Sequence, residues 1–478
     1  MQMIIGGQKV DSSDKKVMEV INPATGELID SVPCATRDDV NKAIDIAQQG
    51  RKIWAATPQH ERTRILFKCA EILDAHAEEL ATLICKEMGK TLKDCRGEAG
   101  ACGRVIRGFA ERANHLYGET FPTSWPGLEN DIIFTRREPL GVVVCVIPFN
   151  FPASTMAYKI GAALAMGNAV IIKPSSENPL CDIRMVELLL EAGLPESVIQ
   201  VVTGRGSAVG GYFTDSPKVN CMFLTGSTEV GVTVARNAAT NLQRVYLELG
   251  GNDVLIVFDD ADLELAVEEV MIGRIATCGQ MCVSTKRLLV QNGVKEKFTK
   301  MLVEKISKLK VGDPFDAATD VGCLISEKAA TEVENQVNHT IKQGAKCAIG
   351  GKRFNKTFFE PTVLTDVTKD MDVAKDMEIF GPVMPIIGFD TVDEAVDIAN
   401  SSIYGLSGGV MTKDISKGIT VATRIETGTM AVNGTGRYRH YDHAFGGYKM
   451  SGLGREGIGY TLEEMSQVKT IALKRILK

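Results

Sequence analysis

Apolar runs that alternate with helical patterns constrain the fold of this chain more than any other feature. In the intervening segment after the first run, Met156, Ile160, Ala163 and Leu164 recur with the spacing of one helix face. Strands that are apolar throughout are usually buried on both faces, so this alternation predicts an α/β fold with a doubly wound parallel sheet. The strand-like runs span residues 142–147, 169–172, 198–202, 221–224 and 245–249.

A second α/β series is expected after Gly250 and Gly251. Residues 254–257 read as a strand, a helix with an apolar face starting at Leu263 follows, and either Asp259 or Asp260 could be its N-cap. The alternation continues to about Val432. A chain of 478 residues exceeds the usual size of one hydrophobic core, so two or three domains are expected.

The ends of the chain read differently from its centre. Residues 36–116 show helical patterns, the last of them from about Leu92 to Leu116, and residues 118–138 could form strands that protrude from the body. The apolar run 468–473 is a plausible edge strand. Such a strand near a terminus invites pairing with another subunit, so a homodimer or homotetramer is expected.

Composition excludes several classes of partner and location. The formal net charge of −6 argues against nucleic acid or an anionic membrane surface as the main partner. The twelve cysteines are scattered without C-x-x-C pairs, which favours a reduced protein without a metal site. The start shows no signal-peptide pattern, and the most apolar stretch, 160–172, is too short to span a bilayer. A cytoplasmic protein is expected.

Polar residues follow the predicted strands at the edge where a doubly wound sheet binds ligands. Asn150 lies between two prolines, where its amide could face an oxyanion or simply cap the next helix. Lys173 could reach a ribose or a phosphate, and the helix start after Gly226 could receive a pyrophosphate. Glu248, at the end of a buried strand, could be a general base or a salt-bridged boundary residue.

A short loop with two cysteines, Cys278 and Cys282, follows the helix of the second series. Either thiol could be a small buried hydrophobe, the usual state of a free cysteine, or a nucleophile if its thiolate is favoured. Cys278 could form a reversible bond with its neighbour on oxidation, although a buried bystander is the better interpretation.

Taken together, these features resemble the aldehyde dehydrogenase superfamily, in its NAD(P)-dependent hydrolytic branch. The resemblance covers nearly the whole chain. It rests on five motifs in order: Pro-Phe-Asn-Phe-Pro at 148–152, Phe-Leu-Thr-Gly-Ser at 223–227, Leu-Glu-Leu-Gly-Gly at 247–251, Gly-Gln-Met-Cys at 279–282 and Glu-Ile-Phe-Gly-Pro at 378–382.

The resemblance implies a role for each matching residue. Cys282 corresponds to the nucleophile, Glu248 to the base that activates the deacylating water, Asn150 to the oxyanion donor and Lys159 to a proton-relay lysine. The expected reaction oxidises an aldehyde to a carboxylic acid through a thiohemiacetal and a thioester. The cofactor-binding residues implied are Pro148, Lys173, Ser175, Ser176, Gly226, Ser227, Leu249, Glu378 and Phe380.

The resemblance also implies three functional regions. Residues 1–119 and 141–249 would bind NAD(P), residues 250–445 would form the catalytic domain, and residues 120–140 and 446–478 would form a small β oligomerisation element. Ser176 stands where many NAD-preferring members have a ribose-binding glutamate, with Glu177 one position later. A serine removes a charge that would repel a 2′-phosphate, so NADP is slightly favoured over NAD.

The substrate is a small aldehyde that the motifs alone do not identify. Met281 and Val283 beside Cys282 are apolar, so any charge on the substrate has to be met farther away. A small hydroxy-aldehyde or semialdehyde, such as lactaldehyde or succinic semialdehyde, is expected. A CoA-acylating relative and a non-catalytic binding protein on this scaffold are the alternatives, although Glu248 favours water as acyl acceptor. Candidate substrate residues are Arg104, Arg107, Arg437, Arg439 and His440, and the last three belong to a loop that could equally be a solvated surface.

Overall fold

The computed structural model describes residues 1–122 and 124–477, and its first sheet contains the five predicted parallel strands. They occupy the centre of an eight-stranded sheet, which confirms the α/β prediction. In spatial order the strands are β2 (Gln8–Val10), β1 (Met3–Ile5), β9 (Ile199–Val201), β8 (Ala169–Lys173), β7 (Val142–Val146), β10 (Cys221–Thr225), β11 (Arg244–Glu248) and β23 (Gly452–Leu453).

Helices cover this sheet on both faces. Successive side chains of a strand point to opposite sides, and because the strands are apolar throughout, both faces have to be shielded from water. In β7, Val142 and Val144 pack into one core cluster, whereas Val143 and Cys145 pack into another. The first cluster lies under α1 (Arg37–Ala56), α7 (Gly206–Thr214) and α8 (Thr228–Ala238). The second lies under α2 (Gln59–Ala75), α3 (Ala77–Met88), α4 (Leu92–Ala113), α5 (Pro152–Ala165) and α6 (Leu180–Glu191).

The second α/β series forms a seven-stranded sheet with its own core, and all its pairings are parallel except that of β14. The strand order is β14 (Lys346–Ile349), β17 (Thr362–Val367), β18 (Val383–Phe389), β13 (Arg287–Gln291), β12 (Val254–Val257), β20 (Ser407–Met411) and β21 (Thr429–Val432). The accompanying helices are α9 (Leu263–Val270), α10 (Asn292–Ile306), α11 (Glu327–Lys342), α12 (Val392–Asn400) and α13 (Ile415–Arg424).

Two local predictions about helix ends were wrong, one in α9 and one in α4. The N-cap of α9 is Asp262, which accepts hydrogen bonds from the backbone amides of Glu264 and Leu265, and not Asp259 or Asp260. Asp260 instead bonds the Thr412 hydroxyl and pairs with Lys417. Helix α4 ends at Ala113, three residues before the expected end.

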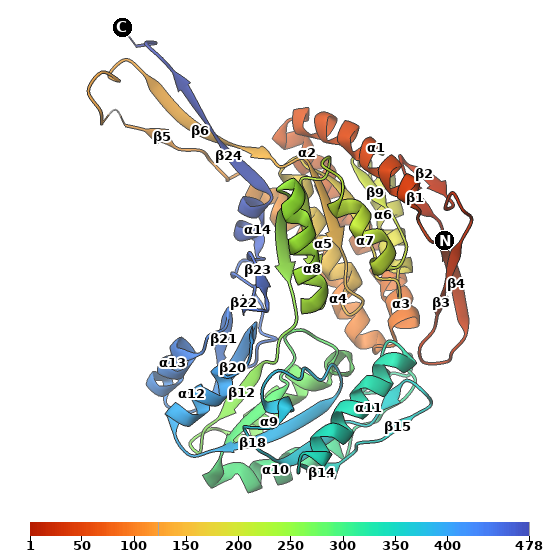
Figure 1. Ribbon diagram of the computed structural model, residues 1–478, viewed down its shortest axis with the longest axis vertical. Coiled ribbons are helices and arrows are strands. Elements are labelled where there is room, and N and C mark those ends of the chain that lie inside the picture. The colour runs from red at the N-terminus through yellow and green to blue at the C-terminus, as the bar shows by residue number, and fades with distance from the viewer. Residues whose placement is uncertain (123, 478) are drawn as a thin grey trace.

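The protruding segment predicted between residues 118 and 138 forms an arm with the C-terminal strand (Figure 1). Strand β6 (Ile132–Pro139) lies between β5 (Thr120–Phe121) and β24 (Ser466–Leu473), all antiparallel, so the predicted edge strand is confirmed. The tail from residue 446 is not one bridging segment, however. Its β23 completes the first sheet, and α14 (Ile458–Glu464) packs on α4.

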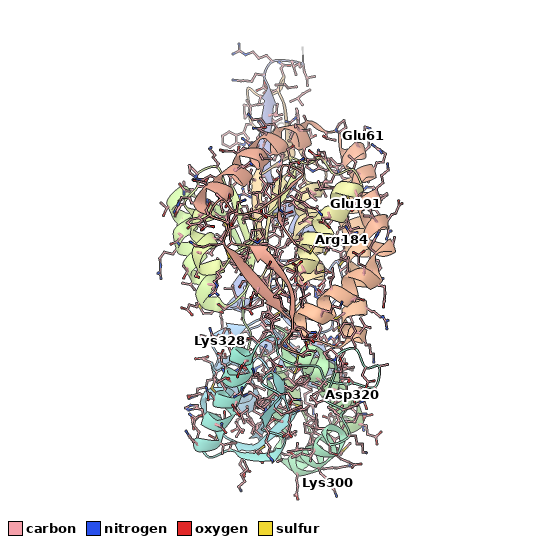
Figure 2. All side chains as sticks on the ribbon, turned by 90° about the vertical axis from the view of Figure 1, so that its right-hand side faces the viewer. Glu61, Arg184, Glu191, Lys300, Asp320 and Lys328 are labelled. Atoms are coloured by element: carbon pink, nitrogen blue, oxygen red, sulfur yellow. The ribbon has the colours of Figure 1, made fainter. Side chains whose placement is uncertain are left out.

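The two sheet bodies lie one above the other along the long axis. In Figure 2, Arg184, whose guanidinium pairs with the Glu191 carboxylate at 3.1 Å, marks the upper body, and Lys300 of α10 marks the lower end. Among the described residues, no helix combines the length and apolarity needed to cross a membrane. The remaining short strands pair as β3 (Val17–Ile21) with β4 (Leu28–Pro33), β15 (Arg353–Phe354) with β16 (Phe358–Phe359), and β19 (Tyr404–Gly405) with β22 (Tyr448–Lys449).

Candidate active site

A cavity of about 310 Å³ lies between the two sheet bodies, where strands β10 and β11 end. It gathers Asn150, Glu248 and Cys282, which are far apart in the sequence. The residues that line it are Asn150, Phe151, Ser154, Thr155, Tyr158, Thr225, Glu248, Met281, Cys282, Val283, Gly436, Arg437, Arg439, Tyr441, Phe445 and Glu456.

The loop that carries Cys282 has an irregular backbone. After α9 the chain makes a π turn at Met271–Ile275 and a 3₁₀ turn at Ala276–Gly279, in which Thr277 and Cys278 have φ of +55°. Gly279 has φ of +71°, and a Cβ there would lie 2.3 Å from the Gly381 carbonyl oxygen, so only glycine fits. Cys278 is buried in the second core, as expected of a bystander.

Asn150 crosses the junction to reach this loop. Its side-chain Nδ2 donates to the Gln280 carbonyl oxygen at 2.9 Å, and the residue is buried except where it faces the cavity. Gln280 is itself fixed, because its Oε1 accepts a hydrogen bond from the Ile325 backbone amide at 2.9 Å. The amide of Asn150 and the thiol of Cys282 therefore have a defined relative position.

The Glu248 carboxyl and the Cys282 thiol face each other in the cavity. Burial, together with the nearby Glu456 carboxylate, raises the pKa of Glu248 to about 7. Burial and the adjacent Glu248 raise the pKa of the Cys282 thiol well above its ordinary value, against the opposing charge of Lys286. Glu248 is thus poised to exchange protons near neutral pH, and the resting thiol holds its proton.

Two cations surround the two carboxylates. Lys159 is fully buried, 3.6 Å from Glu456 Oε1 and 3.7 Å from the centre of the Phe223 ring, and burial lowers its pKa. Arg439 donates to Glu456 Oε2 at 2.7 Å. Burial would raise the pKa of Glu456, but these two cations outweigh it and hold the pKa below its ordinary value. Glu456 is therefore ionised.

Sequence reasoning missed Glu456. It lies in the glycine-rich tail between β23 and α14, where neither an apolar run nor a strand end marks it. Only the fold reveals that its side chain is buried beside Lys159.

The residues expected to bind a cofactor follow one edge of the first sheet. Lys173 is buried, which lowers its pKa to about 8. Ser175 and Ser176 are partly exposed just after it. Gly226 and Ser227 directly precede α8, with Ser227 as its N-cap, and the N-terminal amides of this helix can receive phosphate oxygens. These features fit a dinucleotide.

On the other side of the junction, Glu378 Oε1 lies 3.2 Å from Lys286 Nζ, which also donates to the Cys282 carbonyl at 2.5 Å. The Phe380 ring meets Phe149 edge to face at 5.9 Å. Pro148 lies beside Phe149 on the same loop, and Leu249 is buried under α8, beside Gly231. Glu378 and Phe380 are thereby brought beside the Cys282 loop.

The structure separates the candidate substrate residues into two groups. Arg437 and Arg439 line the cavity, and Arg104 reaches its rim through a 3.4 Å hydrogen bond to the Tyr441 hydroxyl. Arg107 and His440 do not line the cavity. Arg107 pairs with Asp74 on α2, and the exposed His440 ring accepts a hydrogen bond from the Asp442 backbone amide of its own loop.

Known proteins share both this sequence and this fold. The model of the aldehyde dehydrogenase family matches residues 9–471. The chain belongs to the aldehyde dehydrogenase family. It is 40% identical over 474 residues to a mitochondrial succinate-semialdehyde dehydrogenase of Arabidopsis thaliana, covering 99% of this chain and 89% of that protein. It is 37% identical over 473 residues to a lactaldehyde dehydrogenase of Methanococcus aeolicus, covering 98% and 99%.

A solved structure of an NADP-dependent enzyme of Escherichia coli superposes with a TM-score of 0.96 at 36% identity, covering 99% of this chain and 98% of that one. The protein is thus an NAD(P)-dependent aldehyde dehydrogenase. It oxidises an aldehyde to a carboxylic acid through a cysteine-bound thiohemiacetal and thioester, as the sequence predicted.

The pKa of Glu248 sets a testable pH dependence. Because the carboxylate is the basic form, turnover should rise as the pH passes through about 7 and then level off. Glu456→Gln removes a negative charge that raises this pKa and frees two cations that lower it. The rising limb of kcat against pH should therefore move to lower pH.

Glu463→Gln, an exposed glutamate on α14, is the matched control and should leave the limb in place. A limb that stays fixed or moves to higher pH in Glu456→Gln would contradict the assignment.

Proposed function

We propose that this aldehyde dehydrogenase acts on short aldehydes that carry an anionic or hydroxyl group at the far end, such as a semialdehyde or a 2-hydroxy-aldehyde. The observation that supports this most directly is the polarity of the cavity. Met281 and Val283 flank Cys282 with apolar side chains, whereas Arg437 and Arg439 line the cavity from the opposite loop. The named activities of the two relatives, on succinic semialdehyde and lactaldehyde, fit this pattern.

In the proposed mechanism, the Cys282 thiol releases its proton to solvent and the thiolate sulfur attacks the aldehyde carbon, while Glu248 is reserved for the later hydrolytic step. The Asn150 amide and the Cys282 backbone amide stabilise the resulting oxyanion. A nicotinamide held near Glu378 and Phe380 would accept the hydride that leaves the former aldehyde carbon when the oxyanion collapses, and a thioester would remain on Cys282. Asn150 and Cys282, which both line the cavity, therefore have to be held in fixed positions for the thioester to form.

Water then completes the reaction. Glu248 removes a proton from a water molecule, which attacks the thioester and releases the carboxylic acid and the free thiol. Lys159 and Glu456 lie behind Glu248 and can carry its proton away. The cavity-facing base with its own relay supports water as the acyl acceptor, in preference to CoA, and supports catalysis over a purely binding role.

We keep the proposed boundaries of the first two regions and limit the oligomerisation element to residues 120–140 and 466–473, because β23 and α14 pack on the first body. Residues 1–119 and 141–249 bind the cofactor, with Lys173 and Ser176 at the adenosine ribose and the start of α8 at the pyrophosphate. Residues 250–445 carry the nucleophile, with Glu378 and Phe380 at the nicotinamide end. The two sheets, each with its own hydrophobic core, support this division.

The arm, residues 120–140 with β24, is proposed to join subunits into a homodimer or homotetramer. Exposed apolar side chains of the arm support this: Trp125 is 74% exposed, Val468 59% and Phe121 45%. The molar mass in solution measures it, and a monomer would contradict it. The cytoplasmic location stays a prediction.

Arg437 is the cation best placed for a substrate anion. Arg439 is paired with Glu456, so most of its charge is already neutralised. Arg437 donates one hydrogen bond, from Nη1 to the Ile272 carbonyl at 2.8 Å, and no carboxylate among residues 1–122 and 124–477 forms a salt bridge with it. Its remaining guanidinium donors are available to a carboxylate.

Replacing Arg437 by glutamine should weaken binding of anionic aldehydes selectively. Loss of a charge-assisted hydrogen bond of about 1.5–3 kcal/mol corresponds to a kcat/KM roughly 10- to 100-fold lower for succinic semialdehyde. For propanal, which has no anionic group, the change should be small. Steady-state assays with both aldehydes measure this, and Arg107→Gln is the matched control because Arg107 pairs with Asp74 outside the cavity. Equal losses for both aldehydes would contradict the role.

Ser176 is proposed to permit NADP. A glutamate there would accept hydrogen bonds from ribose hydroxyls and repel a 2′-phosphate, so Ser176→Glu should shift the ratio of kcat/KM values toward NAD by about tenfold or more. Titration of both cofactors against the wild type and Ser176→Gln, an uncharged control of similar size, tests this. An unchanged ratio in Ser176→Glu would refute the role.

A further inference from the structure

The loop that presents Asn150 is held from behind by a buried lysine. Lys90 Nζ donates to the main-chain carbonyl oxygen of Asn150 at 2.9 Å and lies 4.4 Å from the centre of the Phe151 ring. The side-chain amide of Asn150, on the opposite side of the residue, donates to Gln280. Asn150 is thus fixed at its backbone by one domain and at its side chain by the other.

Lys90 does not act alone, because it forms a buried salt bridge with Glu98 of α4. The side chains are 0% and 1% exposed, respectively. The other carboxylate oxygen of Glu98 accepts a hydrogen bond from the Ser154 backbone amide at 3.1 Å, at the start of α5. The pair therefore holds the loop at Asn150 and the first turn of the following helix at Ser154.

The same pair is linked to the nucleophile loop by a second route. The carbonyl of Gly89, directly before Lys90, accepts a hydrogen bond from the Cys323 backbone amide at 3.0 Å. Gln280 Nε2 donates to the Cys323 carbonyl at 3.4 Å, and its Oε1 accepts from Ile325. Lys90 bonds the main chain of Asn150 and Gln280 bonds its side chain. Both are thus connected through hydrogen bonds to residues 323–325.

Stability alone does not account for the pair. A buried ion pair is often no more stabilising than apolar residues of the same volume, since both charges lose their hydration. Burial would lower the pKa of Lys90, but the charge of Glu98 outweighs it and keeps the lysine protonated. Neither side chain lines the cavity, so neither can touch the substrate there. The two charged groups instead form hydrogen bonds with the backbone: Lys90 with the Asn150 carbonyl oxygen and Glu98 with the Ser154 amide.

We propose that Lys90 and Glu98 are positioning residues that fix the Asn150 amide at the site of the developing oxyanion. The proposal rests on the role of Asn150 proposed above. It predicts that a neutral pair at these positions slows formation of the thioester without weakening cofactor binding.

The test is a double-mutant cycle on the rate of the first turnover. Lys90→Met/Glu98→Gln removes both charges at similar volume, and Asn150→Ala removes the oxyanion donor. Asn150→Ala should slow the burst of reduced nicotinamide by about 100- to 1000-fold. The neutral pair should slow it roughly 10- to 100-fold in the wild-type background but less than about threefold in Asn150→Ala, because the effect passes through that amide.

Glu87→Gln is the matched control, since Glu87 is a buried glutamate that accepts hydrogen bonds from Leu180 and Cys181 and, among the described residues, forms no hydrogen bond with the Asn150 loop. It should leave the burst rate unchanged. Thermal unfolding and cofactor titration check each variant, and Glu98→Gln alone serves if the double replacement does not fold.

A slow Asn150→Ala combined with an equal loss from the neutral pair in both backgrounds would overturn this proposal alone. A wild-type burst in the neutral pair would do the same. If Asn150→Ala itself keeps the wild-type burst, the proposed role of Asn150 fails first, and the positioning role fails with it.

Discussion

The hydrogen bond from the Asn150 side chain to the Gln280 carbonyl joins the two sheet bodies where the reaction takes place. On one side stand the carboxyl ends of the first sheet's strands, which supply Asn150 and Glu248. On the other stands the Cys282 loop, whose backbone permits no side chain at Gly279. The distance between oxyanion donor and nucleophile depends on this contact, and thus on the packing of one body against the other.

Charge in the interior is arranged around the same junction. Glu456 raises the pKa of Glu248, while Lys159 and Arg439 keep Glu456 ionised. Glu248, Glu456 and Lys159 would each be costly to bury alone, and together with Arg439 they hold the pKa of Glu248 at about 7. Because Arg439 is paired with Glu456, Arg437 is the cation that we propose for substrate recognition. The electrostatics of catalysis thereby limit which residues can determine specificity.

Much of the site was predictable because its chemistry sits at strand ends. Parallel strands share one carboxyl edge, so Asn150, Lys173 and Glu248 could be placed together from the apolar runs that precede them. Glu456 and Lys90 could not, since each is a charged residue outside any apolar pattern, buried by partners remote in sequence. Helix position likewise did not reveal that Arg107 turns toward Asp74 instead of the cavity.

The central claim is that Cys282 carries an acyl group that Glu248 then releases to water. It is tested most directly by rapid mixing of Glu248→Gln with aldehyde and cofactor, followed by acid quench and mass analysis of the intact protein and of its peptides after digestion at low pH. The account predicts one burst of reduced nicotinamide, about one equivalent per active site, then a stall with the acyl mass on the Cys282 peptide. Steady turnover at the wild-type rate, or a burst without the adduct, would contradict it.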